Sequence, residues 1–231
     1  MHTIPLTIVD KFFEDPDSIR KWALTLPYYK DEKGRWPGGR TVALHEINPE
    51  FVDYFSKKFF SLFFNFELED IHWSMDVCFH QIDKSYGRGW IHQDDSTRIA
   101  GIVYLTPDAD INSGTSIYAR TNETVFSGNK LEAIMSKVNF YKTGIPTLEE
   151  TEPHRQQVAS EFTETVKINN IYNRLVAYDG HIHHAANDFT AEENNTRLTM
   201  VFFVTRLLAD KSPIHRIRSI PTHLPFQRPV V

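Results

Sequence analysis

Four β-rich runs between residues 73 and 204 limit the folds that this chain can adopt. In residues 73–82, apolar side chains such as Val77 and Phe79 alternate with polar ones such as His80. Side chains two residues apart share one face of a strand, so this pattern predicts a strand with one buried face. The other three runs are residues 98–105, 174–178 and 197–204. We therefore expect a mainly β domain with flanking helices.

Two helix starts precede these runs. Asp15 and Asn48 are each followed by a proline, which suits a first helical turn because its missing N–H has no intrahelical partner there. The first helix should begin at Pro16 and stop before Pro27. The second should cover residues 49–63, where apolar side chains recur at helical spacing. Both helices are expected to lie over a sheet.

With 231 residues, of which 41% are hydrophobic, the chain can bury the core of one large domain. We expect a single domain over residues 1–231, made of helical N-terminal support (1–70), a β core (73–205) and a C-terminal tail (206–231). Residues 120–171 form an insertion in that core, with a short amphipathic helix near residues 130–138. Such an insertion is usually a lid or binding loop, the alternative being a surface loop without a role.

Charge and composition exclude several classes of function. The net charge of −5 provides no basic field for a nucleic-acid backbone, so no nucleic-acid partner is expected. No apolar run approaches the length of a membrane span and the N-terminus lacks a signal-peptide pattern, which predicts a soluble, cytoplasmic protein. Cys78 is the only cysteine, so an internal disulfide and a cysteine-rich zinc site are excluded.

The candidate chemistry begins with His92 and Asp94. If residues 91–94 are extended, these two side chains point to one face while Gln93 points away, so the spacing delivers two ligands to one metal ion. A His-x-Asp pair is common by chance. The assignment of a metal site therefore depends on further ligands elsewhere in the chain.

Three histidines, His181, His183 and His184, follow a strand that ends at Asp179 and Gly180. Desolvating an imidazole is costly, so three of them within four residues are difficult to explain as packing, and we expect one to be a metal ligand. An exposed polar loop is the alternative. Two imidazoles and one carboxylate on one face of iron(II) leave its other positions open for substrate and oxygen, which predicts an oxidative enzyme.

Arg197, shortly after the histidine cluster, is a candidate anion-binding residue. It shares a strand face with Thr199, whereas the opposite face of residues 197–204 is apolar enough to lie under the N-terminal helices. A guanidinium that points into a core needs an anion, and it binds a carboxylate through two parallel hydrogen bonds. A ligand carboxylate is one candidate partner, and a surface acid such as Asp188 or Glu192 is the other.

The order His-x-Asp, distal histidine and Arg-x-Thr resembles the iron(II)- and 2-oxoglutarate-dependent oxygenases, particularly their prolyl-hydroxylase-like branch. Further matches are residues 101–107 (GIVYLTP), 114–115 (GT) and 173–176 (NRLV). The resemblance extends over residues 73–205. Upstream, residues 9–13 (VDKFF) and 36–41 (WPGGRT) are similar to the N-terminal part of a little-characterised bacterial and phage subfamily.

This resemblance implies a distorted double-stranded β-helix, or jelly roll, that hydroxylates a substrate while converting 2-oxoglutarate to succinate and carbon dioxide. His92, Asp94 and His184 would hold iron(II), with His183 and His181 as alternatives for the third ligand. Dioxygen and 2-oxoglutarate would be the co-substrates, with ascorbate as an optional addition.

The same resemblance implies that Arg197 binds the distal carboxylate of 2-oxoglutarate, with Thr199 and Tyr104 as hydroxyl donors. Candidate substrate contacts are Trp90, Tyr118 and Arg40. Two other functions stay open. A metal-dependent cupin-type hydrolase or isomerase would use the same metal ligands without needing Arg197, and a catalytically silent jelly-roll binding module would tolerate an empty site.

Overall fold

Two antiparallel sheets form the centre of the computed structural model, which describes residues 3–94, 96–121, 130–189 and 196–215. The larger sheet contains β1 (Thr7–Val9), β2 (Tyr29–Lys30), β3 (Gly39–Arg40), β4 (His72–Asp83), β5 (Ile99–Tyr104), β8 (Leu175–Asp179) and β10 (Thr196–Leu208). The smaller sheet contains β6 (Thr115–Arg120), β7 (Phe162–Ile168) and β9 (His183–Ala186). The helices are α1 (Pro16–Thr25), α2 (Leu44–Ile47), α3 (Pro49–Phe60), α4 (Lys130–Thr143) and α5 (Leu148–Ala159), with a short 3-10 helix η1 (Lys84–Tyr86).

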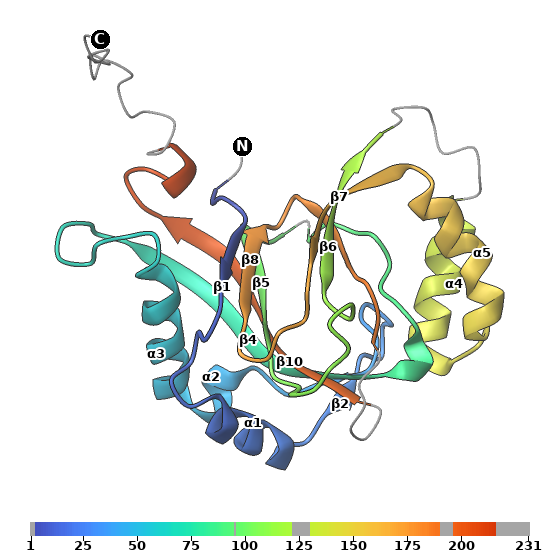
Figure 1. Cartoon of the computed structure of the whole chain (residues 1–231), viewed down its shortest axis with the longest axis horizontal. Coiled ribbons are helices and arrows are strands. Elements are labelled where there is room, and N and C mark those ends of the chain that lie inside the picture. The colour runs from blue at the N-terminus through green and yellow to red at the C-terminus, as the bar shows by residue number, and fades with distance from the viewer. Residues whose placement is uncertain (1–2, 95, 122–129, 190–195, 216–231) are drawn as a thin grey trace, which may run out of the picture.

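The order of strands is β1-β8-β5-β10-β4-β3-β2 in the larger sheet and β7-β6-β9 in the smaller one (Figure 1). β10 lies at the centre of the larger sheet, where it pairs with β4 on one side and β5 on the other. Several neighbours in the sheet, such as β4 and β10, are far apart in the sequence, as in a jelly roll. The prediction of a mainly β protein with flanking helices is confirmed.

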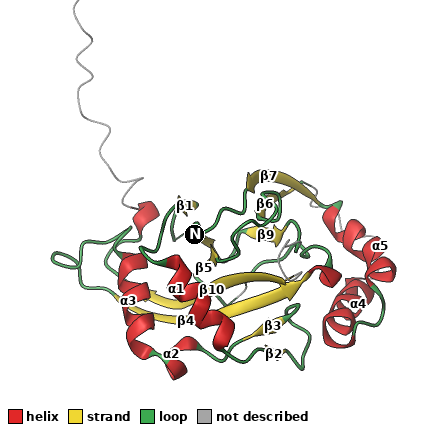
Figure 2. Ribbon diagram, turned by 60° about the horizontal axis from the view of Figure 1, so that its bottom comes forward, coloured by secondary structure: helices red, strands yellow, loops and turns green. Residues whose placement is uncertain are grey.

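The main core lies between the larger sheet and α1 and α3, which cover one of its faces (Figure 2). Phe202 in β10 packs edge-on against Phe55 and Phe59 of α3, with ring centroids 5.1 and 4.9 Å apart. Gly101 lies opposite Phe202 in β5, and a Cβ there would come within 2.1 Å of the Phe202 ring. The apolar face of β10 therefore packs under the helices as predicted, which leaves Arg197 and Thr199 on the other face.

Both predicted helix starts carry the expected caps. The carboxylate of Asp15 accepts a hydrogen bond of 3.0 Å from the Ser18 N–H, and the side chain of Asn48 accepts one of 3.0 Å from the Phe51 N–H. These side chains satisfy N–H groups that have no partner within the helix. α1 ends before the proline that was expected to stop it, and α3 ends at Phe60, earlier than expected.

Residues 120–171 contain more regular structure than the sequence indicated. α4 begins at Lys130 as predicted, but α5 and β7 were not predicted, and β7 pairs along β6 as part of the smaller sheet. Arg155 of α5 donates a hydrogen bond of 2.6 Å to the backbone carbonyl oxygen of Arg88. The side chain of Arg88 in turn forms an ion pair of 2.6 Å with the carboxylate of Glu152 in α5. These contacts tie α5 to the loop that follows η1.

Figures 1 and 2 both place α4 and α5 together, away from the α1 to α3 group. Within the part of the chain that the structure describes, none of the helices combines the length and the apolar character needed to cross a bilayer. The predicted C-terminal tail is described only in part, because its first residues belong to the end of β10 and residues 216–231 lie outside the described residues.

Candidate metal centre

His92 and His184 come together because their backbones pair. The N–H of each residue donates a hydrogen bond of 3.0 Å to the carbonyl oxygen of the other, which adds a short bridge to the edge of β9. Their rings lie beside each other with centroids 4.4 Å apart. Two segments that are distant in the sequence thus present their imidazoles to one place.

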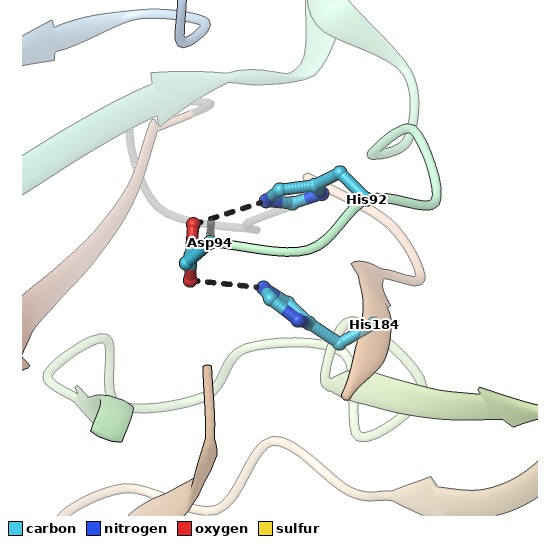
Figure 3. Close-up of side chains that lie close together, drawn as sticks. All are labelled: His92, Asp94 and His184. Carbon is cyan, nitrogen blue, oxygen red and sulfur yellow. Dashed lines mark ion pairs between the residues drawn. The ribbon is translucent and has the colours of Figure 1, made fainter. Parts of the chain in front are cut away.

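Asp94 completes the group (Figure 3). Its Oδ1 lies 3.8 Å from Nε2 of His92 and its Oδ2 lies 3.5 Å from Nε2 of His184. One ligand atom from each of the three residues lies within 4.8 Å of the others. Two imidazole nitrogens and one carboxylate oxygen converging in this way fit a divalent transition metal such as iron(II), with coordination positions left open.

Hydrogen bonds fix which nitrogen each ring presents. Nδ1 of His92 lies 2.7 Å from the carbonyl oxygen of Trp90, and Nδ1 of His184 lies 2.9 Å from that of Ile182. A carbonyl oxygen can only accept, so each Nδ1 carries the proton and each Nε2 keeps its lone pair. Burial is the main cause that lowers the pKa of both histidines, which favours the neutral form that a metal requires.

The other two histidines of the cluster do not join this group. The ring of His183 packs against Phe162, with centroids 4.6 Å apart. His181 is exposed, and its backbone N–H donates to the Asp179 carboxylate at 3.0 Å while its carbonyl oxygen accepts from the side chain of Gln93. Of the three alternatives left open by the sequence, His184 is the one that the structure brings to His92 and Asp94.

Arg197 is buried, with 2% of its surface exposed. Its Nε and Nη2 are shielded from solvent and have no hydrogen-bond partner among the described residues. The guanidinium carbon lies 5.3 Å from the ring centre of Tyr104 and 5.9 Å from that of Phe189. Burial lowers the pKa of Arg197, and the charge of Asp188 acts on it only weakly in the opposite direction. Glu192, the other surface acid considered as a partner, lies outside the described residues.

The two predicted hydroxyl donors occupy different places. Thr199 faces the cavity beside Arg197 and is fully buried. Tyr104 is not among the cavity-lining residues; its hydroxyl donates a hydrogen bond of 2.9 Å to Oγ1 of Thr115, and its ring contacts Arg197. Burial raises the pKa of Tyr104, so the phenol stays protonated behind the guanidinium.

One cavity of about 690 Å³ between the two sheets contains the three metal-ligand candidates and Arg197. Trp90 and Arg40, named from the sequence as candidate substrate contacts, also line it, whereas Tyr118 does not. Among the lining residues that were not named as candidates from the sequence are His80 and Lys137. His80 stands on the polar face of a strand whose alternation was visible in the sequence, but Lys137 comes from α4, and nothing in the sequence indicated that this lysine would reach the cavity.

Comparison with known proteins adds a family and a fold. Residues 1–204 match the model of a family of unknown function, DUF6445. No curated protein matches the sequence. HygX from Streptomyces hygroscopicus, solved with nickel and 2-oxoglutarate bound, superposes with a TM-score of 0.52 at 11% identity, covering 87% of this chain and 83% of HygX.

Two further solved structures are similar. EvdO2 from Micromonospora carbonacea var. aurantiaca has a TM-score of 0.51 at 10% identity, covering 89% of this chain and 88% of EvdO2. A prolyl hydroxylase from Trichoplax adhaerens, in complex with a hypoxia-inducible-factor peptide, has a TM-score of 0.50 at 14% identity, covering 94% and 87% of the two chains. The chain therefore belongs to the DUF6445 family and has the double-stranded β-helix fold of the iron- and 2-oxoglutarate-dependent oxygenases.

Proposed function

We propose that this protein is an iron(II)- and 2-oxoglutarate-dependent dioxygenase that hydroxylates a substrate and converts 2-oxoglutarate to succinate and carbon dioxide. The observation that carries the proposal is that His92, Asp94 and His184 share a cavity with the buried guanidinium of Arg197. A metal-dependent hydrolase could use the same three ligands, but it has no need of a buried cation beside them. HygX, which is similar in fold, was solved with nickel and 2-oxoglutarate bound, which supports this choice.

In this proposal the two imidazoles bind iron through Nε2 and Asp94 binds it through a carboxylate oxygen. The hydrogen bonds from Nδ1 to the carbonyl oxygens of Trp90 and Ile182 hold both rings in orientation before any metal arrives. When bound, iron(II) supplies the activation of dioxygen that couples decarboxylation of 2-oxoglutarate to oxidation of the substrate.

Arg197 binds the distal carboxylate of 2-oxoglutarate. Nε and Nη2, the two nitrogens without a partner among the described residues, lie on one edge of the planar guanidinium and match the two oxygens of a carboxylate. An unpaired cation in a buried site is costly, so the incoming carboxylate is bound strongly. Thr199 provides a hydroxyl on the same strand face, and apolar neighbours such as Val201 and Phe189 exclude water.

The decisive experiment is anaerobic spectroscopy of the iron(II)-loaded protein. Addition of 2-oxoglutarate should produce a visible metal-to-ligand charge-transfer band, because the 2-oxo acid chelates the iron. His92→Ala should abolish the band, since a ligand is lost. Arg197→Ala should keep the metal but require at least about tenfold more 2-oxoglutarate to reach the same band, because a charge-assisted hydrogen-bond pair is removed.

His183→Ala is the matched control. This histidine neighbours His184 in β9, but its ring packs on Phe162, so the band should be retained at wild-type 2-oxoglutarate concentrations. If the wild-type protein binds iron stoichiometrically and gives no band, the dioxygenase assignment is wrong. An equal response of the wild type and Arg197→Ala would reject the role given to the guanidinium.

A further inference from the structure

A second guanidinium, that of Arg40, reaches into the same cavity from β3. Its carbon lies 4.3 Å from the ring centre of Trp36 and 5.2 Å from that of Phe203, so aromatic rings hold it in place. The Nε of Arg40 and the indole Nε1 of Trp36 are both shielded from solvent, and neither has a hydrogen-bond partner among the described residues. Two N–H donors therefore stand beside the cavity without an acceptor.

Arg40 belongs to a row of side chains that crosses one face of the larger sheet. Thr199 of β10 lies between Tyr104 of β5 and His80 of β4. His80 lies opposite Arg40 of β3, which ends the row. Residues directly opposite each other in a sheet share a face. Arg40 and Tyr104 thus lie at opposite ends of this row. Because Arg197 contacts Tyr104, the guanidiniums of Arg40 and Arg197 line different parts of the cavity wall.

Five other arginines of the described residues have carboxylate partners. The ion pairs are Arg35 with Asp31, Arg88 and Arg155 with Glu152, Arg120 with Glu161, and Arg174 with Asp10. In contrast, the cavity cations Arg40, Lys137 and Arg197 form no ion pair with a carboxylate of the described residues. The charge of Asp94 acts on Arg40 and Lys137 only at longer range. Three cations that line one cavity without a carboxylate partner among the described residues indicate that anions from outside the chain complete the site.

The charges that line the cavity support the same conclusion. Arg35 lines it too, but Asp31 balances its charge at 2.9 Å. The remaining charged residues of the described wall are the cations Arg40, Lys137 and Arg197 and the carboxylates Asp76 and Asp94. A divalent iron and the dianion of 2-oxoglutarate would cancel each other, so the loaded site keeps one positive charge in excess. A substrate with a single negative charge would neutralise it.

We infer that the substrate carries a carboxylate, which binds to Arg40 and to the indole N–H of Trp36, with Lys137 adding positive charge from α4. This inference rests on the proposed function, because the loaded site defines the place left for the substrate. The cavity volume of about 690 Å³ is in the range that accommodates one drug-sized ligand, so beside 2-oxoglutarate it holds only a small acid or a single acidic side chain. Arg40 is a binding and specificity residue in this scheme, not a metal ligand.

The test uses acetate as the probe and the indole N–H signal of Trp36 as the reporter. In nuclear magnetic resonance spectra of the full chain loaded with zinc(II) and saturated with 2-oxoglutarate, acetate should shift that signal saturably, whereas the neutral isostere acetamide should not. Trp36→Phe assigns the signal. Arg40→Gln should weaken the acetate affinity at least about tenfold, because a charge-assisted hydrogen bond is lost.

Arg35→Gln is the matched control. Arg35 also stacks on Trp36, at 4.5 Å, but it is exposed and paired with Asp31, so the affinity for acetate should stay within about twofold of the wild type. The inference is overturned if acetamide acts like acetate, if Arg40→Gln has no effect, or if saturating 2-oxoglutarate abolishes the acetate response, which would assign Arg40 to the 2-oxoglutarate site. Inorganic phosphate binding at least about tenfold more tightly than acetate would replace the carboxylate with a phosphoryl group and overturn it as well.

The same titration without zinc and 2-oxoglutarate separates this inference from the proposed function. If acetate binding to the metal-free protein depends on Arg40, but the iron(II)-loaded protein gives no charge-transfer band with 2-oxoglutarate, the dioxygenase assignment is rejected and the anion site is supported. A protein that gives the band but shows no acetate response would keep the dioxygenase assignment and lose the anion site.

Discussion

The backbone N–H of Asp94 donates a hydrogen bond of 2.8 Å to the carbonyl oxygen of Gly180, which joins a proposed metal ligand to the turn after β8. The turn has no spare room. A Cβ at Gly180 would lie 2.2 Å from the carbonyl oxygen of Thr97, and the N–H of Thr97 donates in turn to the carbonyl oxygen of Asp94 at 2.9 Å. The position of the carboxylate therefore depends on a residue without a side chain.

Gly180→Ala should weaken metal binding about 10- to 100-fold, the usual cost of disturbing a residue that supports a ligand. The added methyl group must displace Thr97, whose backbone it would meet, and Thr97 is hydrogen-bonded to the carbonyl oxygen of Asp94. Calorimetric titration with zinc(II) measures the loss, and circular dichroism checks that the fold is retained. Gly144→Ala is the control: it has a left-handed backbone but no atom within 4 Å, so it should cost about 1 kcal/mol of stability and leave metal affinity unchanged. Equal zinc affinities for the wild type and Gly180→Ala would contradict the prediction.

Metal binding should stabilise the fold, because its ligands come from two segments that only the folded chain brings together. At a free zinc(II) concentration of 100 times the dissociation constant, the gain in the free energy of unfolding is about 2.7 kcal/mol. Thermal unfolding with and without metal measures it. His184→Ala should remove the gain and His183→Ala should keep it. Of these two neighbouring histidines, His184 faces Asp94, whereas the ring of His183 packs on Phe162. A gain that survives in His184→Ala would place the metal elsewhere.

The long strands and capped helices could be predicted because each has a strong local signal. β4 alternates between two faces from Trp73 to His80, β10 contains a long apolar run, and Asp15 and Asn48 combine a capping side chain with a following proline. β6, β7, β9 and α5 were missed. β9 has only four residues, two of them histidines, and its pairing with β6 is a tertiary contact that local sequence does not express.

The choice between His183 and His184 shows the same limit at the level of one residue. Neighbouring side chains in a strand point to opposite faces, so a shift of one residue in the register between β9 and β6 would exchange them. The register is fixed by pairs such as Ile117 with His184, which the sequence does not show. Lys137 could not be predicted for a related reason, because it reaches the cavity only through the packing of α4 against the rest of the domain.

Arg197→Met should make the protein without metal and 2-oxoglutarate more stable. The guanidinium is buried, and two of its nitrogens have no partner among the described residues, whereas the methionine side chain is apolar and of similar length. Replacing buried charge with packed apolar groups is often neutral or stabilising by about 1–4 kcal/mol. Urea unfolding of the metal-free proteins measures the difference. A clearly destabilised Arg197→Met would mean that Arg197 stabilises the fold and is not held unpaired for a ligand.

The free energy of unfolding should fall as the pH drops below about 6.5, the ordinary pKa of histidine, because His80 is buried in its neutral form. Its ring is buried, and its Nε2 lies 2.7 Å from the carbonyl oxygen of Pro37. Burial, followed by the charge of Arg40, lowers its pKa well below the ordinary value, and the charge of Arg197 adds to this. Below pH 6.5 the unfolded chain therefore takes up a proton that the folded chain refuses, so the unfolded state gains up to about 1.4 kcal/mol per pH unit.

His80→Gln isolates this effect, because the amide can still donate to the carbonyl oxygen of Pro37 but does not titrate. Its free energy of unfolding, measured in urea between pH 7 and pH 5, should fall less steeply than that of the wild type, by up to about 1.4 kcal/mol per pH unit. The slope that remains belongs to the other groups, including the buried His92 and His184. Identical slopes for His80→Gln and the wild type would mean that the folded protein accommodates a charged imidazole between two guanidiniums, and the assignment of His80 as a neutral hydrogen-bond donor would be wrong.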